Sequence, residues 1–248
     1  MKKNISLDEE IRLNKYLSDA GVCSRREADR LIEKGLVKVD GVTASMGMKI
    51  LPKQKVSVKG KPVVREEKMV LIAVNKPVGI ECTSDRSNRD NIIDYIGYPT
   101  RIYNIGRLDK NSHGLILMTN DGSIVNGISK SSNSHEKEYV VTVNKPVTEE
   151  FLEKMAGGVP ILDTVTRKCK VEKFGKFKFR IILTQGLNRQ IRRMCEYCGY
   201  KVTRLVRVRV MNIKLGDLKP GEYRAVTEQE IAELYELIKD SSNETVMR

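Results

Sequence analysis

The amino-acid sequence predicts two domains of the α+β class: a small N-terminal domain, and a larger one on a largely antiparallel mixed sheet with flanking helices. The chain has 248 residues, 40% hydrophobic and 31% charged, so it can bury more than one core. Residues 61–68 are polar, contain a proline and lack hydrophobic periodicity, which is typical of a linker. Beyond them, strand and helix patterns mix without βαβ alternation, which favours an α+β domain over a doubly wound one. We therefore expect domains at 1–60 and 69–240, with a polar tail at 241–248.

The N-terminal domain is predicted to contain two helices followed by short strands. Apolar residues at helical spacing predict the first helix: Leu13, Tyr16, Leu17 and Ala20. Ser24 and Glu27 form the pattern of a capping box, so a second helix is expected to begin after Ser24 and to end near Gly35. The turn pair Asp40-Gly41 separates two of the predicted strands. The strands are expected at 36–39, from 43 onward and at 56–58.

The larger domain is expected to begin with a continuous apolar strand at 69–74. A capping box at Thr227 and Glu230 marks the start of the last helix. The remaining strands are predicted at 115–119, 138–143, 177–183 and 201–210. The helices are predicted at 123–129, 149–156, 188–197 and 227–238.

The net charge of +13 predicts a polyanionic partner, with nucleic acid ahead of an acidic membrane surface. Between Lys176 and Arg209, ten basic residues stand against one acidic residue, Glu196, which predicts a phosphate-facing surface. A membrane partner ranks lower because no basic amphipathic segment carries large apolar anchors. No apolar run reaches the roughly 18 residues that cross a bilayer. The basic start of the chain is followed by acidic residues 8–10 instead of an apolar segment, so we expect a cytoplasmic protein.

The five cysteines are scattered and odd in number, which argues against a disulfide framework. Cys195 and Cys198 have CxxC spacing, but a zinc site needs about four ligands and no second pair completes one. A redox dithiol prefers a helix N-terminus, whereas this pair follows a basic amphipathic stretch. We expect two ordinary buried or half-buried thiols and no metal.

The N-terminal domain resembles the S4 RNA-binding module over residues 11–58. The matching segments are Arg12-Leu-Asn-Lys-Tyr-Leu17, Cys23-Ser-Arg-Arg-Glu-Ala28 and Gly35-Leu-Val-Lys-Val-Asp-Gly41. In S4 modules the second helix and the following hairpin meet RNA. The resemblance therefore implies RNA contacts by Arg25, Arg26, Arg30 and Lys38.

The larger domain resembles the pseudouridine synthases of the group that contains the RsuA and RluA families. Three motifs appear in the family's order. They are Gly106-Arg-Leu-Asp109 followed by Gly114-Leu-Ile-Leu-Met-Thr-Asn-Asp-Gly122, then Lys137-Glu-Tyr139, then Leu183-Thr-Gln-Gly186 with Asn188-Arg-Gln-Ile-Arg-Arg-Met194. An isolated aspartate in a glycine-bounded loop is usually a turn former or helix cap, and the surrounding motif overturns that interpretation of Asp109.

The resemblance implies that Asp109 is the nucleophile, Tyr139 the active-site tyrosine and Arg192 the basic partner that keeps Asp109 ionised. Arg193 is the competing candidate for this partner. Leu183 is expected to pack on the pocket floor, and Arg107 to help hold the uridine out of its helix. Arg189 and Arg193 are expected to contact the substrate RNA. Isomerisation of uridine transfers no group in and changes no oxidation state, so we expect no cofactor.

Within the RsuA branch, the resemblance implies a uridine in a stem-loop of 23S rRNA, with tRNA as an additional substrate and a monomeric enzyme. A non-catalytic RNA-binding or ribosome-assembly factor would explain the charge and the S4-like segment. It would not explain Asp109, Tyr139 and Arg192 together. A carboxylate-dependent hydrolase would want a second catalytic carboxylate, and the motif around Asp109 offers none.

Overall fold

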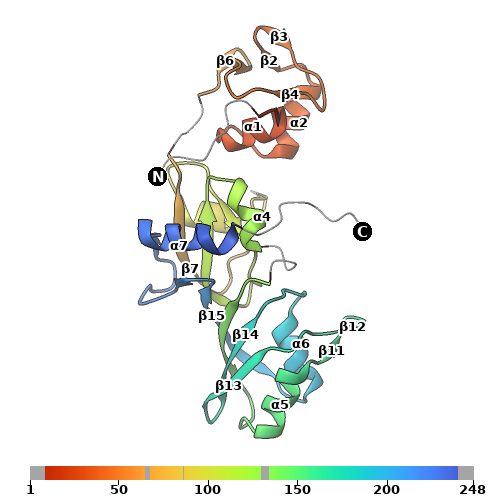
Figure 1. The fold of residues 1–248 in the computed structure, drawn as a ribbon, viewed down its shortest axis with the longest axis vertical. Coiled ribbons are helices and arrows are strands. Elements are labelled where there is room, and N and C mark those ends of the chain that lie inside the picture. The colour runs from red at the N-terminus through yellow and green to blue at the C-terminus, as the bar shows by residue number, and fades with distance from the viewer. Residues whose placement is uncertain (1–8, 65–67, 86, 130–133, 240–248) are drawn as a thin grey trace. The chain divides into compact units, whose positions relative to one another are not determined.

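The computed structural model describes residues 9–64, 68–85, 87–129 and 134–239, and these form two compact units (Figure 1). The first unit comprises residues 1–70 together with the short segments 98–102 and 119–122, and the second unit comprises the rest. The tail predicted at 241–248 lies outside the described residues.

The first unit has the predicted two helices, α1 (Leu13–Asp19) and α2 (Arg25–Glu33). The Ser24 side chain accepts a hydrogen bond from the backbone N–H of Glu27, which supplies the expected N-cap of α2. Asp40 and Gly41 both have positive φ (49° and 85°), as the tight turn between two twisted strands requires. Apolar side chains of both helices and of the strands form one core.

The strands of the first unit form a four-stranded sheet in the order β3-β2-β5-β6, and a separate pair, β1 with β4. Their bounds are β1 (Ile11–Arg12), β2 (Val37–Val39), β3 (Val42–Thr43), β4 (Lys49–Ile50), β5 (Val56–Val58) and β6 (Lys61–Pro62). Strand β6 pairs with β5, so the first two residues of the predicted linker belong to this sheet.

The second unit is built on a sheet that has nine strands in the described part of the chain, with the path β13-β14-β10-β15-β9-β7-β17. Strand β15 runs parallel to β9, whereas β10 is antiparallel to both β14 and β15, so the sheet is mixed. The strands are β7 (Leu71–Lys76), β8 (Tyr103–Ile105), β9 (His113–Thr119), β10 (Lys137–Val143), β13 (Lys170–Gly175), β14 (Lys178–Leu183), β15 (Val202–Val210), β16 (Ile213–Lys214) and β17 (Tyr223–Ala225). A separate pair joins β11 (Pro160–Ile161) and β12 (Thr164–Val165). The α+β class is confirmed.

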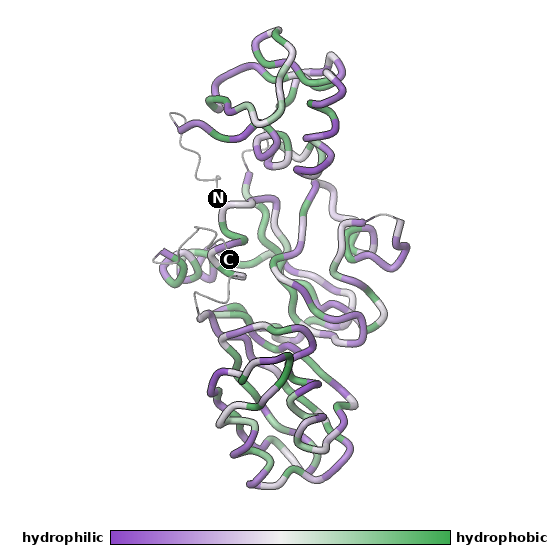
Figure 2. Tube along the Cα trace, turned by 90° about the vertical axis from the view of Figure 1, so that its right-hand side faces the viewer, coloured by the Kyte–Doolittle hydropathy of each residue, from purple (hydrophilic) through white to green (hydrophobic). Residues whose placement is uncertain are grey.

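Helices α5 and α6 cover one face of this sheet. Alternate residues of β10 and β14, such as Val141 and Phe179, share a buried cluster with Phe151 of α5 and Met194 of α6. Burying one such side chain contributes roughly 1.5–3 kcal/mol, so this layer fixes α6 on the sheet. The helices of the unit are α3 (Ile92–Ile96), α4 (Ser123–Ser129), α5 (Glu149–Gly157), α6 (Gln190–Tyr197) and α7 (Glu228–Ile238). Figure 2 shows hydrophobic stretches alternating with hydrophilic ones along the chain of each unit.

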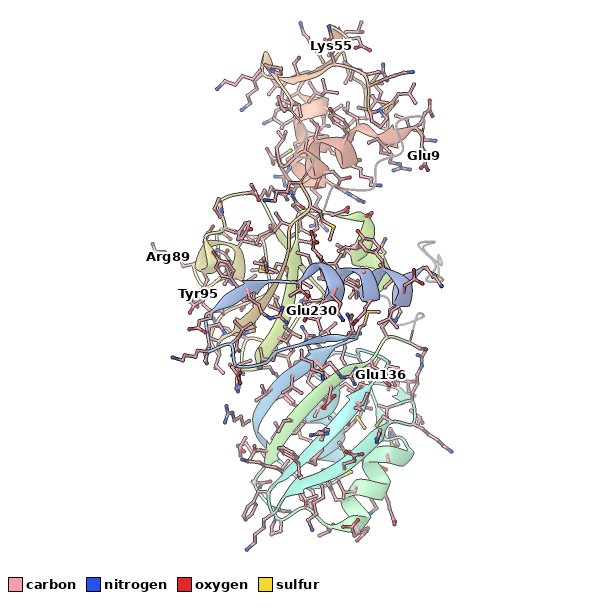
Figure 3. All side chains as sticks on the ribbon, turned by 60° about the vertical axis from the view of Figure 1, so that its left-hand side comes forward. Glu9, Lys55, Arg89, Tyr95, Glu136 and Glu230 are labelled. Atoms are coloured by element: carbon pink, nitrogen blue, oxygen red, sulfur yellow. The ribbon has the colours of Figure 1, made fainter. Side chains whose placement is uncertain are left out.

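A chain of ion pairs crosses the sheet beside this core. It begins at Lys170 and Glu172 on β13, continues to Arg180 on β14 and Glu138 on β10, and ends at Arg209 and Glu136. Glu136 is labelled in Figure 3. Arg180 and Arg209 therefore have carboxylate partners within the protein. The basic stretch from Lys176 to Arg209 is not one continuous phosphate-facing surface, which corrects that expectation.

Candidate active site

A cavity of about 460 Å³ opens in the second unit, where the loop before β9 meets β10, β14, β15 and the start of α6. The cavity brings together most of the residues predicted from the catalytic motifs: Arg107, Asp109, Tyr139, Leu183, Arg189 and Arg192. Arg193 is not among the lining residues; its guanidinium donates to the backbone oxygen of Asn188 at 3.1 Å. The segments that form the cavity are separated by up to a hundred residues in sequence.

The loop that carries Asp109 connects β8 to β9 and is held at several backbone positions. Gly106 has φ of 70°, a left-handed conformation that glycine adopts without strain. The backbone N–H of Leu108 donates to the sulfur of Cys82 at 3.3 Å, and the backbone N–H of Ser112 donates to the backbone carbonyl oxygen of Asp109 at 3.0 Å. Asp109 itself is half-buried. Its carboxylate is thus presented to the cavity from a fixed loop.

Lys76, at the end of β7, holds the same loop and was not assigned a role from the sequence. Its side chain is fully buried, and its ammonium donates to the oxygens of Pro77 at 2.7 Å, Ile80 at 2.6 Å and, more weakly, Lys110 at 3.4 Å. Burial lowers the pKa of Lys76, while the nearby Cys82 and Asp109 act in the opposite direction. A lysine at the end of an apolar strand is usually exposed, so the sequence does not predict that Lys76 is buried and binds backbone oxygens.

Two arginines of α6 divide the contacts to this loop. The Nη1 atom of Arg189 lies 4.0 Å from Oδ2 of Asp109, and this is the ion pair of Asp109 in the described structure. Arg192, the predicted partner, instead donates from Nη2 to the backbone oxygen of Asn111 at 2.9 Å and to Oγ of Ser112 at 3.3 Å. Arg189 is also the N-cap of α6 with φ of 50°, a left-handed backbone that is uncommon outside glycine.

The charge of Asp109 acts on Arg192 even without a direct hydrogen bond between them. Burial, and then the charge of Arg189, lowers the pKa of Arg192, while Asp109 raises it. The structure therefore differs from the expected single Asp109–Arg192 pair: one arginine contacts the carboxylate, and the other fixes the backbone that follows it.

Tyr139 and Leu183 form part of the cavity wall on neighbouring strands. Tyr139 lies opposite Ile181 of β14 and Arg207 of β15, and it packs against the core below. Leu183 is buried, with 3% of its surface exposed, as expected for a residue on the pocket floor. The arrangement offers an aromatic ring beside an apolar floor, which suits a flat base.

Arg207 was counted in the phosphate-facing stretch, but it is a buried structural residue. Its Nε donates to the oxygen of Leu115 at 2.7 Å and its Nη1 to the oxygen of Arg107 at 3.3 Å. It lies beside Gly114 in the parallel register of β9 and β15, where any Cβ atom on Gly114 would collide with the Arg207 backbone. Basic and apolar residues alternate along β15, a pattern that predicts an exposed position for Arg207.

In the first unit, the predicted RNA-contacting residues Arg25, Arg26, Arg30 and Lys38 are all exposed on α2 and β2. Arg30 pairs with Glu27 at 3.1 Å, an exposed pair worth at most about 1 kcal/mol. Within the described ranges, the other three have no ion pair.

The CxxC pair lies at the end of α6, as the sequence predicts. Burial raises the pKa of the Cys195 thiol, and Cys198 is the C-cap of the helix. Among the residues that the structure describes, no group of three or more His, Cys, Asp or Glu side chains is placed to hold a metal ion. Over the same ranges, no helix has the length and apolar character to span a bilayer.

A carboxylate, a tyrosine and two arginines line one cavity, and a separate unit carries exposed basic side chains, which are the groups expected of an RNA-modifying enzyme. Residues 70–197 match the family of RNA pseudouridylate synthases, and residues 11–58 match the S4 domain. The chain therefore belongs to the RNA pseudouridylate synthase family, and it is an RNA pseudouridine synthase with an N-terminal S4 domain. The alternative of a non-catalytic RNA-binding factor is wrong.

Relatives and a solved structure agree. The chain is 54% identical to the dual-specificity RNA pseudouridine synthase RluF of Escherichia coli K12, over 96% of this chain and 82% of that protein. It is 36% identical to an RNA pseudouridine synthase of Aquifex aeolicus, over 92% and 95% of the two chains. A crystal structure of a pseudouridylate synthase superposes with a TM-score of 0.67 at 28% identity, covering 90% of this chain and 99% of that one.

Proposed function

We propose that the enzyme isomerises one uridine in a stem-loop of 23S rRNA, with tRNA as an additional substrate. The uridine would be flipped out of its helix into the cavity, where Asp109 acts as the nucleophile. The observation that carries this proposal is the presence of Asp109, Tyr139 and the two arginines in one cavity. The dual specificity in the name of the Escherichia coli relative agrees with more than one RNA substrate.

Isomerisation of uridine needs few chemical groups besides those that line the cavity. The N1–C1′ bond of uridine breaks, the detached base rotates and a C5–C1′ bond forms. The proton on C5 is lost and N1 gains one, so the composition and the oxidation state of the nucleoside are unchanged. A carboxylate can carry such a rearrangement through a covalent intermediate. Arg189 would hold the Asp109 carboxylate and Arg192 the backbone that follows it, while Tyr139 stacks on the base and Leu183 supports it. The apolar floor and surrounding loops would exclude water from the detached base.

Flipping gives Arg107 a role as well. An enzyme that acts on C1′ and C5 must unstack the base, at a cost of a few kcal/mol. Arg107 is exposed and lines the cavity, so its guanidinium can occupy the space that the base leaves.

The direct test is to react the enzyme with protein-free 23S rRNA and, separately, with tRNA, and to map the pseudouridines formed. We expect one strong site in a 23S stem-loop and a weaker one in tRNA. Pseudouridine in neither RNA, or scattered modification of unrelated uridines, would contradict the proposed substrate.

A further inference from the structure

Lys137 is half-buried and places a positive charge at the cavity wall. It begins β10, where it lies opposite Leu183 of β14 and Val210 of β15. Because side chains two residues apart on a strand share a face, Lys137 and Tyr139 point the same way, and both line the cavity. The mechanism above gives Lys137 no role.

The charges around the cavity are unbalanced. Five cationic side chains line it against one carboxylate, that of Asp109. Arg189 pairs with Asp109, and Arg192 and Arg207 donate to backbone oxygens at 2.9 and 2.7 Å. Lys137 has only a 3.5 Å contact with the oxygen of His135, and no carboxylate partner among the described residues. Lys137 therefore lacks the close oxygen partners that Arg189, Arg192 and Arg207 have.

Partial burial of an ammonium group without a counter-charge costs free energy. Burial, with the neighbouring charge of Arg207 as the second cause, lowers the pKa of Lys137 to about 8. An apolar residue would fill this position without that cost, so the position favours a ligand that supplies negative charge.

We propose that the ammonium group of Lys137 binds a backbone phosphate next to the nucleotide that enters the cavity. The phosphodiester is the anionic group that unmodified RNA offers at neutral pH, and it accepts hydrogen bonds from lysine. This inference rests on the proposed entry of the uridine into the cavity, and adds a phosphate-binding residue to it.

Phosphate binding couples RNA affinity to pH. Protonated Lys137 binds the phosphate, so affinity falls as pH rises through the pKa of free Lys137, about 8. The charged and titratable groups facing Lys137 are Arg207 on β15, His135 and Tyr139 on its own segment, and Arg107, Asp109, Arg189 and Arg192 around the cavity. Burial lowers the pKa of His135 below its usual 6.5, so His135 stays neutral over this range.

The test measures binding of a stem-loop RNA from pH 7 to 9.5 at constant ionic strength, in an Asp109→Asn background that prevents turnover. With Lys137 present, affinity should fall by up to about thirtyfold, as linkage to one proton with a free pKa near 8 predicts. With Lys137→Arg, whose cation persists, affinity should change little over the range. With Lys137→Met, affinity at pH 7 should already be reduced and nearly independent of pH. An equal fall in the Lys137→Arg protein, or unchanged affinity in Lys137→Met at pH 7, would overturn the proposal.

Two further measurements identify the ligand and exclude a structural role. RNA with a neutral methylphosphonate on one side of the target uridine, each side in turn, should lose the pH dependence in one of the two cases. If the pH dependence of RNA affinity persists with the methylphosphonate on either side, Lys137 does not bind a phosphate next to the target uridine.

Lys137→Met should also unfold at the same temperature as the parent protein or higher, because it removes a desolvated charge. A marked drop in the unfolding temperature would show that Lys137 has a structural role. Pseudouridine formation by protein with Asp109 intact tests the proposed function separately.

Discussion

Asp109 and the loop that carries it are held by different arginines, and this separates the effects of removing each one. Arg192→Met should destabilise the protein by about 1.5–3 kcal/mol, because it removes charged hydrogen bonds to Asn111 and Ser112. Arg189→Met should cost less than about 1 kcal/mol, because its ion pair is partly exposed. Both should slow the chemical step. Denaturant unfolding and single-turnover rates at saturating enzyme measure the two quantities.

Arg193→Met is the matched control on the same helix. Arg193 contacts Asn188 and does not line the cavity, so its replacement should weaken RNA binding but leave the single-turnover rate nearly unchanged. If the Arg193→Met enzyme is slow and the Arg192→Met enzyme reacts at the normal rate, Arg193 rather than Arg192 is the basic residue that acts with Asp109.

For single residues, the sequence predicted which side chains share the cavity better than it predicted the contacts that they make. The motifs identified six residues that line one cavity. Arg189 has a left-handed backbone and pairs with Asp109, and no local sequence pattern predicts either feature. The burial of Lys76 and Arg207 and the partial burial of Lys137 were not predicted, because their sequence neighbours resemble those of exposed lysines and arginines.

Gly114 tests the packing of two elements, β9 and β15. Its φ is 109°, and a Cβ atom there would collide with the Arg207 backbone. Gly114→Ala should therefore destabilise the protein by about 2–4 kcal/mol, through backbone strain and displacement of β15. Thermal or denaturant unfolding measures the loss.

Gly157→Ala provides the control, because Gly157 ends α5 and a Cβ atom there meets nothing within 4 Å. It should be neutral or slightly stabilising. Equal stability of the Gly114→Ala protein and the parent protein would show that the two strands can separate at this point without cost.

Elements with caps or long apolar periods were predicted closely. Helix α4 has the predicted bounds, and α7 follows the complete capping box of Thr227 and Glu230. Strand β13 was missed because it is charged and mostly exposed. Its backbone pairing with β14 and the ion pair between Glu172 and Arg180 join it to the sheet, and neither leaves an apolar pattern in the sequence. Strand β17 pairs with β7 across about 150 residues of sequence, a contact that local propensity does not report.

The whole molecule combines an RNA-binding unit with a catalytic unit, and its affinity should depend on both. Replacing Arg25, Arg26 and Lys38 by serine should weaken RNA binding and reduce the slope of log affinity against log salt by roughly two to three, at about 0.7–0.9 per phosphate contact. The single-turnover rate at saturating enzyme should change little. Salt titration of filter binding measures the slope.

A matched control removes three other exposed lysines of the same unit, Lys53, Lys59 and Lys61. It has the same change of net charge but leaves α2 and β2 intact, so its slope should fall less. Equal effects of both triple variants would show that overall charge, rather than the face of α2 and β2, governs binding by this unit.

The two-domain organisation and the α+β class were predictable because each unit has its own apolar periodicity and the two motif sets do not overlap. The boundary between the two domains was harder to predict. Strand β6 extends the first sheet into the predicted linker, and residues 98–102 and 119–122 group with the first unit. Such long-range association depends on tertiary packing, which a single sequence does not display.

The central claim is that Asp109 is the nucleophile, and the most direct test is single-turnover pseudouridine formation by the Asp109→Asn enzyme. Asparagine is nearly isosteric, so the fold and RNA binding should be retained. It lacks the ionised oxygen, so formation of pseudouridine should fall below detection at saturating enzyme. Pseudouridine formed by Asp109→Asn at a rate comparable to that of the unsubstituted enzyme would contradict the claim.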